Sequence, residues 1–329
     1  MARETKGKKT RVAVLMGGPS SEHEVSLRSG RQVAKTLDRD RYEVREVVIS
    51  KKGEWDIQAE ELSKITDVAF IALHGTYGED GTVQAILEKV ELPYTGAGRN
   101  ESALAMNKFA SLTLVRAAGY AVPHSFLVGK AEWLRDPHLA WNQMRHYLGF
   151  PFVVKPNANG SSVGVHIVRT YEELHPAMRD IFSFSREALF QNYIRGCEVT
   201  CTVADHGWSE SAFPLPPTEI IPRVSDFFDY RAKYEIGGSY EITPARFPGP
   251  MLRRIEQTAV GIHKLLGARG ISRSDFIVDG HNTIYFLEIN TIPGFTEVSL
   301  VPKAAAAMGM PFSALLDLII KASLPLETR

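Results

Sequence analysis

The chain has 329 residues, 44% of them hydrophobic, which is enough for about two to three globular domains with ordinary cores. Its 38 Lys and Arg residues balance its 38 Asp and Glu residues, so no overall field would attract nucleic acid or an anionic membrane surface. No apolar run approaches the roughly 18 residues of a membrane span, and the first ten residues lack the apolar core of a signal peptide.

From these features we expect a cytoplasmic protein with no nucleic-acid and no membrane partner. Residues 1–10 are polar and basic and are expected to form a solvated tail outside the fold. The next hundred residues alternate apolar runs with helical patterns, which predicts an N-terminal α/β domain with an open parallel sheet, bounded at 11–107. Its predicted elements are strands at 12–16, 43–50 and 68–73, a helix at 23–37, and a helix that carries Val83, Ile86, Leu87 and Val90.

The rest of the chain mixes helices, strands and one long loop. The predicted elements are helices at 100–118, 131–147, 250–266, 303–309 and 312–321, strands at 151–155, 198–204 and 210–215, and a polar loop at 222–243. The two cysteines, Cys197 and Cys201, have no histidine or second cysteine pair at metal-ligand spacing, so we expect buried free thiols.

The segment 271–294 carries the clearest chemical signal. Asp279 and Gly280 begin a short polar break between two β-prone runs, which predicts a hairpin. A two-residue turn at Gly280 and His281 would pair Asp275 with Phe286 and Arg273 with Glu288. The other face of the hairpin would then receive apolar side chains, namely Phe276, Val278, Tyr285, Leu287 and Ile289.

In this register four polar side chains share one face of the hairpin: Arg273, Asp275, Glu288 and Asn290. Two carboxylates and an amide oxygen suit a hard cation such as Mg²⁺ that bridges to substrate phosphates. The alternative is a surface ladder of salt bridges, which would contribute under about 1 kcal/mol. We therefore expect a metal-phosphate site here.

A second signal is the run KPNANGSSVGV, which begins at Lys155. Gly160, Ser161 and Ser162 belong to a small-residue loop whose backbone N–H groups could wrap a phosphate, while Lys155 supplies a positive charge. An ordinary turn with an exposed lysine is the alternative reading.

Two residues of the first domain are expected to face a cleft, because ligands bind at the carboxyl ends of strands in open α/β sheets. Glu24 follows the first strand and could hold a substrate ammonium, or could serve only the dipole of the helix that it begins. His74 follows the strand at 68–73.

Three further places have both a structural and a functional interpretation. Lys108 begins a helical run and, taken alone, would be a solvated surface lysine. Lys233 and Tyr234 lie in the loop 222–243, which is either a mobile surface loop or a lid over a ligand. Ser299, followed by Leu300, either caps the next helix or binds ligand.

Taken together, these segments resemble the D-alanine:D-alanine ligase family of ATP-grasp enzymes from about residue 11 to 322. The resemblance is carried by GGPSSEHEVSLRSG, ALHGTYGEDGTVQAILE, PYTGAG, MNKFASL, VKPNANGSSVGV, FFDYRAKY, RSDF and LEINTIPGFTEVSLVP. It implies an α/β architecture of three domains, with a central ATP-grasp domain at 108–195 and a C-terminal one at 196–329 that carries the metal site and the lid. It also implies a cytoplasmic homodimer in peptidoglycan synthesis that uses ATP, D-alanine and two Mg²⁺ ions, with Mn²⁺ as a possible substitute.

The resemblance also implies residue roles. The implied ATP-binding residues are Lys108, Lys155, Gly160, Ser161, Ser162, Gln191, Asn192, Ile194, Glu198 and Lys233. The implied metal ligands are Asp275, Glu288 and Asn290. The implied catalytic residues are Glu24, Ser161, Tyr234, Arg273, Gly294 and Ser299. The implied substrate-binding residues are Glu24, His74, Ser299 and Leu300.

Two segments depart from the pattern of the resembling family. Gln191 and Asn192 stand where many relatives have Glu-Lys beside the adenine, which bears on base selectivity and ATP affinity. Arg231 replaces the usual glutamate in the lid. Three functions therefore remain open: ligation of two D-alanines, the same chemistry with D-lactate or D-serine as second substrate, and a nucleotide-binding regulator without turnover. The family tyrosine matched by Tyr234 goes with D-alanine as second substrate, which argues against D-lactate.

Overall fold

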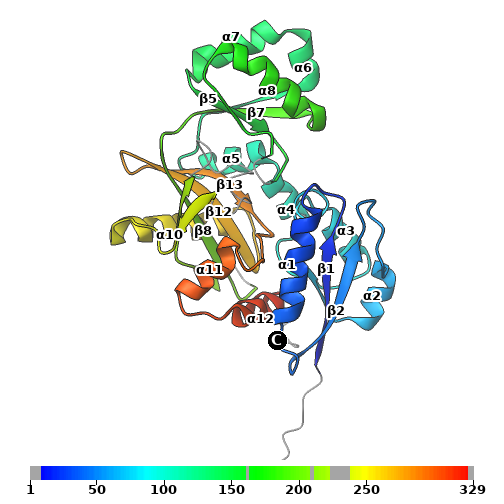
Figure 1. The fold of residues 1–329 in the computed structure, drawn as a ribbon. Helices are drawn as coiled ribbons and strands as arrows, with labels where there is room; N and C mark the ends of the chain where they lie inside the picture. Colours follow the sequence, from blue (N-terminus) through cyan, green and yellow to red (C-terminus); the bar gives the residue numbers. More distant parts are fainter. Residues whose placement is uncertain (1–8, 161–162, 208–210, 223–237, 325–329) are drawn as a thin grey trace, which may run out of the picture.

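The computed structural model describes residues 9–160, 163–207, 211–222 and 238–324. Three sheets organise these residues, and each has its own helices (Figure 1). The N-terminal sheet has three strands, the middle sheet has four, and the C-terminal sheet has six. The mixture of a parallel sheet with antiparallel sheets confirms the predicted α/β class.

The N-terminal sheet has the strand order β2-β1-β3 and is parallel throughout. Its elements are β1 (Thr10–Gly17), α1 (His23–Thr36), β2 (Tyr42–Ile49), α2 (Ala59–Ile65), β3 (Val68–Ile71) and α3 (Thr82–Lys89). The continuous apolar run of β1 is fully buried, as expected when both faces of a parallel sheet are covered. Two C-terminal helices, α11 (Leu300–Ala307) and α12 (Phe312–Ser323), contribute to the same core and lie beside α1 (Figure 1).

The middle sheet is antiparallel, with the order β4-β7-β5-β6. Its elements are β4 (Ser125–Gly129), α6 (Lys130–Arg135), α7 (Pro137–Tyr147), β5 (Phe152–Pro156), β6 (His166–Val168), α8 (Tyr171–Phe184) and β7 (Glu187–Asn192). Phe152 and Phe190 are fully buried in a core between this sheet and its helices, with ring centroids 5.9 Å apart.

The C-terminal sheet has the order β11-β10-β8-β12-β13, and β9 pairs with β8. Its strands are β8 (Gly196–Ala204), β9 (Phe213–Pro214), β10 (Thr218–Pro222), β11 (Ser239–Ile242), β12 (Ile271–Asp279) and β13 (Ile284–Asn290). The helices that share its core are α4 (Arg99–Met106), α5 (Lys108–Ala117) and α10 (Gly249–Leu265).

The hairpin of β12 and β13 forms, but its predicted register was wrong. Val278 pairs with Ile284 and Phe276 with Phe286, because the turn has three central residues, with Asn282 in the left-handed region (φ 65°). A bulge then lets Asp275 pair with Glu288 and Arg273 with Asn290. Phe286 therefore occupies the buried face, while Leu287 and Tyr285, which were predicted there, are only partly buried.

Several element predictions also need correction. The predicted helix at 100–118 is broken at Asn107, because its side chain caps α5 by accepting a hydrogen bond from Ala110 N–H. Asp136 caps α7 in the same way and divides the predicted helix at 131–147. The strand expected at 210–215 is reduced to Phe213–Pro214. Cys197 is exposed rather than buried, whereas Cys201 is buried as predicted.

Some predictions fall on segments without description. Residues 1–8 of the expected tail and residues 223–237 of the expected lid lie outside the described residues, while Thr10 already belongs to β1. The loop predicted at 222–243 is too long at both ends, because Pro222 ends β10 and Ser239–Ile242 pair with β10 as β11. The domain boundaries at 107 and 195 stay predictions. In the part of the chain that the structure describes, no single helix is long and apolar enough to cross a membrane; α11 and α12 meet the length and composition criteria only as a pair bent by 107°.

Candidate active site

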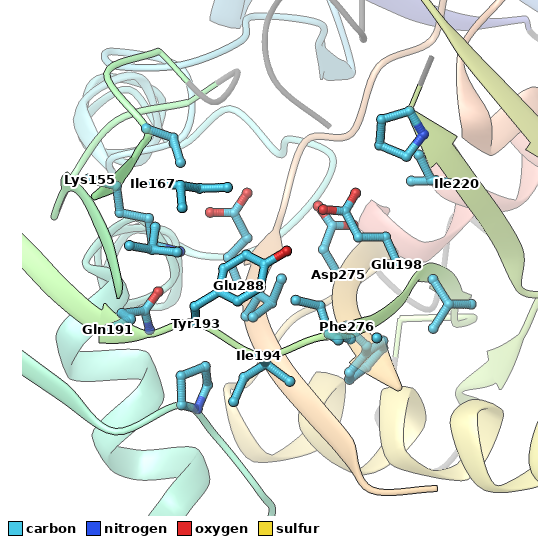
Figure 2. A pocket seen from close by; sticks show the side chains of 18 of the residues that line it. Lys155, Ile167, Gln191, Tyr193, Ile194, Glu198, Ile220, Asp275, Phe276 and Glu288 are labelled. Carbon is cyan, nitrogen blue, oxygen red and sulfur yellow. The ribbon is translucent and has the colours of Figure 1, made fainter. Parts of the chain in front are cut away.

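Two cavities meet between the sheets. The larger, about 420 Å³, lies between the middle and C-terminal sheets and is lined by residues of β5, β7, β8, β10, β12 and β13 (Figure 2). The smaller, about 170 Å³, is lined by Glu22 and His74 of the N-terminal domain and by residues that follow β13. Lys108, Asn159 and Glu288 line both cavities, so these residues mark where the two spaces adjoin.

The larger cavity has an apolar wall and a polar side. Ile167, Ile194 and Phe276 supply apolar surface, and Figure 2 shows the carboxylates of Glu198, Asp275 and Glu288 on the same cavity. Such a combination suits a ligand with a flat apolar part and a charged part. A nucleotide has both.

The predicted adenine contacts Gln191, Asn192 and Ile194 all line this cavity. Gln191 is buried and its Nε2 donates a hydrogen bond to Ser125 Oγ over 3.1 Å. The main-chain N–H of Asn192 donates to His124 O over 3.0 Å, and within the described residues its buried Oδ1 has no hydrogen-bond partner.

The two predicted phosphate lysines are buried in the larger cavity rather than solvated on the surface. Lys108 Nζ donates to Asn159 O over 2.6 Å and lies 3.4 Å from Glu288 Oε2. Lys155, on β5, is also buried. Burying an ammonium group is costly without compensation, so two buried lysines on one cavity, of which Glu288 pairs with Lys108, provide positive charge for an anionic ligand.

The four polar residues of the hairpin lie together, although the register that brings them together differs from the predicted one. Arg273 makes two hydrogen bonds to Asp275, each 2.9 Å, and Thr200 Oγ1 donates to Asp275 Oδ1 over 2.7 Å. The side chains of Arg273 and Asp275 are only 13% and 19% exposed, which excludes a solvated surface ladder. Asn290 Oδ1 accepts a hydrogen bond from Ile292 N–H over 2.9 Å.

The donor chemistry of Asp275, Glu288 and Asn290 fits a hard divalent cation, because all three present oxygen atoms. Among the described residues, no three His, Cys, Asp or Glu side chains gather into a metal site by themselves. This agrees with an ion that shares its coordination with substrate phosphates, since Mg²⁺ is commonly held by one or two carboxylates together with phosphate. Arg273 and Lys108 balance the two carboxylates in the structure.

The predicted role of Glu24 was wrong. Its side chain is 72% exposed and pairs with Lys51 over 3.2 Å, outside both cavities. Glu22, two residues earlier, is buried and lines the smaller cavity. The spacing could have identified it: Glu22 is the N-cap residue of α1 and lies three and seven residues before the buried Val25 and Ser29, whereas Glu24 is on the exposed face of the helix.

His74 lies on the smaller cavity, as predicted, and is buried. Its Nδ1 donates to Ile292 O over 3.1 Å and its Nε2 accepts from Ser29 Oγ over 2.8 Å. Burial lowers the pKa of His74, which favours the neutral ring with this hydrogen-bond pattern.

Ser299, Leu300 and Gly294 also line the smaller cavity. Ser299 occupies the N-terminal position of α11, but its side chain does not cap that helix. Its Oγ instead accepts a hydrogen bond from Thr296 N–H over 3.1 Å and lies 2.7 Å from Thr296 Oγ1. An added Cβ on Gly294 would lie 2.8 Å from Ser299 Oγ, so a larger residue there would displace the Ser299 hydroxyl group.

Glu79 was not among the predicted site residues, although it lies in the segment HGTYGEDG. It lines the smaller cavity and accepts a hydrogen bond from Gly75 N–H over 2.8 Å. Burial raises the pKa of Glu79 to about 8, and the neighbouring Glu22 adds to this rise. Glu219, paired with Arg246 on the larger cavity, was also missed.

The loop after Lys155 is described only in part. Gly160 lines the smaller cavity, and an added Cβ there would lie 2.5 Å from Glu22 Oε2, so a side chain would displace Glu22. Ser161, Ser162, Lys233 and Tyr234 lie outside the described residues, and their roles stay predictions.

Family models and curated relatives of one kind match nearly the whole chain. The model of the D-ala D-ala ligase N-terminus matches residues 11–66 and 56–97, and that of the D-ala D-ala ligase C-terminus matches residues 114–321. The D-alanine--D-alanine ligase of Syntrophobacter fumaroxidans is 43% identical over 96% of this chain and 98% of its own length. That of Clostridium beijerinckii is 37% identical over 96% of this chain and 99% of its own length.

Solved structures give the same result. The VanG D-Ala:D-Ser ligase of Enterococcus faecalis superposes with a TM-score of 0.84 at 31% identity, covering 96% of this chain and 100% of the other. The D-alanine--D-alanine ligase of Bacillus anthracis complexed with ATP gives a TM-score of 0.77 at 32% identity, covering 95% and 96%. The chain therefore belongs to the D-alanine–D-alanine ligase family.

Proposed function

We propose that this protein joins two D-alanine molecules, at the expense of ATP, through a D-alanyl phosphate. The observation that carries the proposal is the junction of the two cavities at Lys108, Asn159 and Glu288. A nucleotide in the larger cavity would present its phosphates to a small substrate in the smaller one across this junction. The complex of the Bacillus anthracis ligase with ATP supports a nucleotide as the occupant.

The first half-reaction follows from the charges at the junction. A carboxylate is a poor electrophile, so an oxygen of the first D-alanine attacks the γ-phosphorus, the bond to ADP breaks, and an acyl phosphate forms. Two anions must approach each other in this step, and catalysis rests on neutralising their charge. Lys108 and Lys155 are buried on the cavity where the phosphates would lie.

The second half-reaction takes place in the smaller cavity. The amine of the second D-alanine, having lost a proton, attacks the acyl carbon, and inorganic phosphate leaves as the peptide bond forms. The negative charge that develops on the carbonyl oxygen needs donors that are already in place. Arg273 and the Gly294 N–H are proposed as these donors, and both residues line the cavity. Arg273 is preorganised by its two hydrogen bonds to Asp275.

We propose that Asp275, Glu288 and Asn290 hold Mg²⁺, with Mn²⁺ as a substitute. The ion would neutralise the phosphate oxygens of ATP, which is the chemistry that hard cations supply in phosphoryl transfer. This assignment is supported by the three oxygen donors on one face of the hairpin. A cytoplasmic homodimer with no nucleic-acid or membrane partner is part of the same proposal, and the homodimer rests on the family resemblance.

D-Serine is a second candidate acceptor. The similarity to VanG, a D-Ala:D-Ser ligase, over 96% of this chain favours it. The two acceptors differ by one hydroxyl group, which an apolar pocket discriminates against only weakly.

Measuring phosphate release distinguishes ligation of two D-alanines from ligation with another acceptor and from nucleotide binding without turnover. With ATP, Mg²⁺ and D-alanine the purified protein should release phosphate and ADP, and mass spectrometry should detect the dipeptide. L-Alanine serves as the control, and D-serine and D-lactate, each mixed with D-alanine, test the acceptor. The proposal is supported if phosphate release with D-alanine alone is faster than formation of either mixed dipeptide. A mixed product that dominates at neutral pH would reassign the acceptor, and no release with any of them would favour a nucleotide-binding regulator.

A further inference from the structure

An ion pair between α11 and β11 borders the smaller cavity. Lys303 Nζ lies 2.5 Å from Glu241 Oε2, and so joins α11 to β11. Glu241 lines the smaller cavity but not the larger one. The Glu241 side chain is 15% exposed and that of Lys303 is 41% exposed, so the pair presents its acidic member inward and its basic member outward.

The cavity wall next to Glu241 is otherwise suited to an anion. Ser299 and Leu300 line it at the N-terminal end of α11, where the helix dipole favours negative charge. Lys303 belongs to the next turn, and its N–H donates to Ser299 O over 3.4 Å. A carboxylate bordering such a wall would repel an anionic ligand unless its charge were balanced, and Lys303 balances it.

The arrangement of the two cavities indicates which substrate reaches this wall. The donor carboxylate must lie near Lys108 and Glu288, where the nucleotide cavity adjoins. The acceptor therefore lies farther from the nucleotide, and its own carboxylate needs an anion-favouring wall. Ser299, Leu300 and Glu241 border only the smaller cavity, which fits that position.

We propose that the Glu241–Lys303 pair sets the affinity and selectivity for the acceptor. Lys303 is a positioning residue that cancels the charge of Glu241, so the acceptor carboxylate can bind beside Ser299. Because the charge of Lys303 is already paired with Glu241, Lys303 is not free to hold a second carboxylate, so acceptors with an acidic side chain are excluded. This inference rests on the proposed ligase function and deepens it by naming two residues that select the acceptor.

The test is a double-mutant cycle of charge-neutralising substitutions on the full-length protein. Lys303→Met leaves Glu241 uncompensated and should raise the KM for the acceptor D-alanine about tenfold, as expected for one unbalanced charge near the ligand. The KM for ATP should stay constant. Adding Glu241→Gln to Lys303→Met removes the repulsion, so the double variant should regain the wild-type acceptor KM to within about twofold.

Lys321→Met is the matched control, because Lys321 pairs with Asp317 over 3.2 Å on α12 and lines neither cavity. It should leave all KM values unchanged. Glu241→Gln alone should form dipeptides with D-aspartate or D-glutamate as acceptor, which the wild type should not form.

The outcomes separate this inference from the function on which it rests. An unchanged acceptor KM in Lys303→Met, or a double variant as impaired as Lys303→Met, would overturn the inference while leaving the ligase function intact. A parallel rise in the KM for ATP would also overturn it, because the pair would then act on the whole site. A wild type that releases no phosphate with D-alanine would overturn both.

Discussion

At the scale of single residues, Glu22 and Glu24 offer a direct test of which glutamate belongs to the site. Glu22→Gln removes a buried charge from the smaller cavity and should lower kcat/KM for D-alanine about ten- to a hundredfold, the cost of losing a hydrogen bond to a charged group. Glu24→Gln makes the same chemical change at an exposed position and should leave kcat/KM for D-alanine unchanged. Initial rates of phosphate release measure both, and a larger loss in Glu24→Gln would contradict the assignment.

Glu79 should make folding stability depend on pH. Its pKa is raised in the folded state, from 4.5 to about 8, because burial and the neighbouring Glu22 disfavour the charged form. The folded state therefore binds a proton that the unfolded chain has released. The stability that this proton contributes is present below the unfolded pKa and is lost as pH rises through about 8.

Urea unfolding between pH values of about 5 and 9 tests this expectation. The wild type should lose stability steadily as pH rises, and Glu79→Gln should flatten that part of the profile because glutamine does not titrate. Glu24→Gln, at an exposed position, should keep the wild-type profile. Parallel profiles for the wild type and Glu79→Gln would show that another group causes the dependence.

At the scale of elements, the hairpin shows how far sequence reasoning reaches. The alternation of polar and apolar residues identified both strands and placed four polar side chains at the two adjoining cavities. It did not give the register, because turn length and a bulge are set by local backbone conformation. The bulge offsets the longer turn, so Asp275 and Glu288 still meet although their predicted partners were wrong.

Other elements were missed for physical reasons that the sequence hides. The strands β4 and β7 are short, and α8 contains Pro176, which argues against a helix. The helical spacing of Leu174, Met178 and Ile181 was nevertheless a readable signal for α8. Their formation depends on packing in a shared core, in which Leu174, Met178 and Phe190 are fully buried. By contrast, the caps at Asn107 and Asp136 were readable, since both residues are strong N-caps within a helical pattern.

At the scale of the whole molecule, the site exists only because the sheets are assembled. The larger cavity needs the middle and C-terminal sheets, and the smaller one needs Glu22 and His74 from the N-terminal domain. No pattern in the sequence gives the relative placement of segments so far apart. The family resemblance supplied what periodicity could not, namely that these segments belong to one site.

Phe295 is where the C-terminal part of the chain meets the N-terminal sheet. Its ring lies 5.4 Å from that of Phe70 on β3, and its N–H donates to Ser29 Oγ on α1 over 3.3 Å. It directly follows Gly294, which lines the smaller cavity. The packing of this ring therefore fixes the position of the loop that borders the substrate.

Phe295→Ala should lower the free energy of unfolding by about 3–5 kcal/mol, because a fully buried ring leaves a cavity. It should also raise the KM for D-alanine without changing ATP binding, since the loosened loop borders only the smaller cavity. Phe182→Ala, buried in the core of the middle sheet, is the matched control. Urea unfolding should show comparable destabilisation in both variants. Calorimetric ATP binding and steady-state kinetics should show impaired use of D-alanine in Phe295→Ala alone, because the Phe295 ring, unlike that of Phe182, packs against Phe70 of the N-terminal sheet. Equal kinetic losses in the two variants would mean that lost stability, rather than loop position, limits activity.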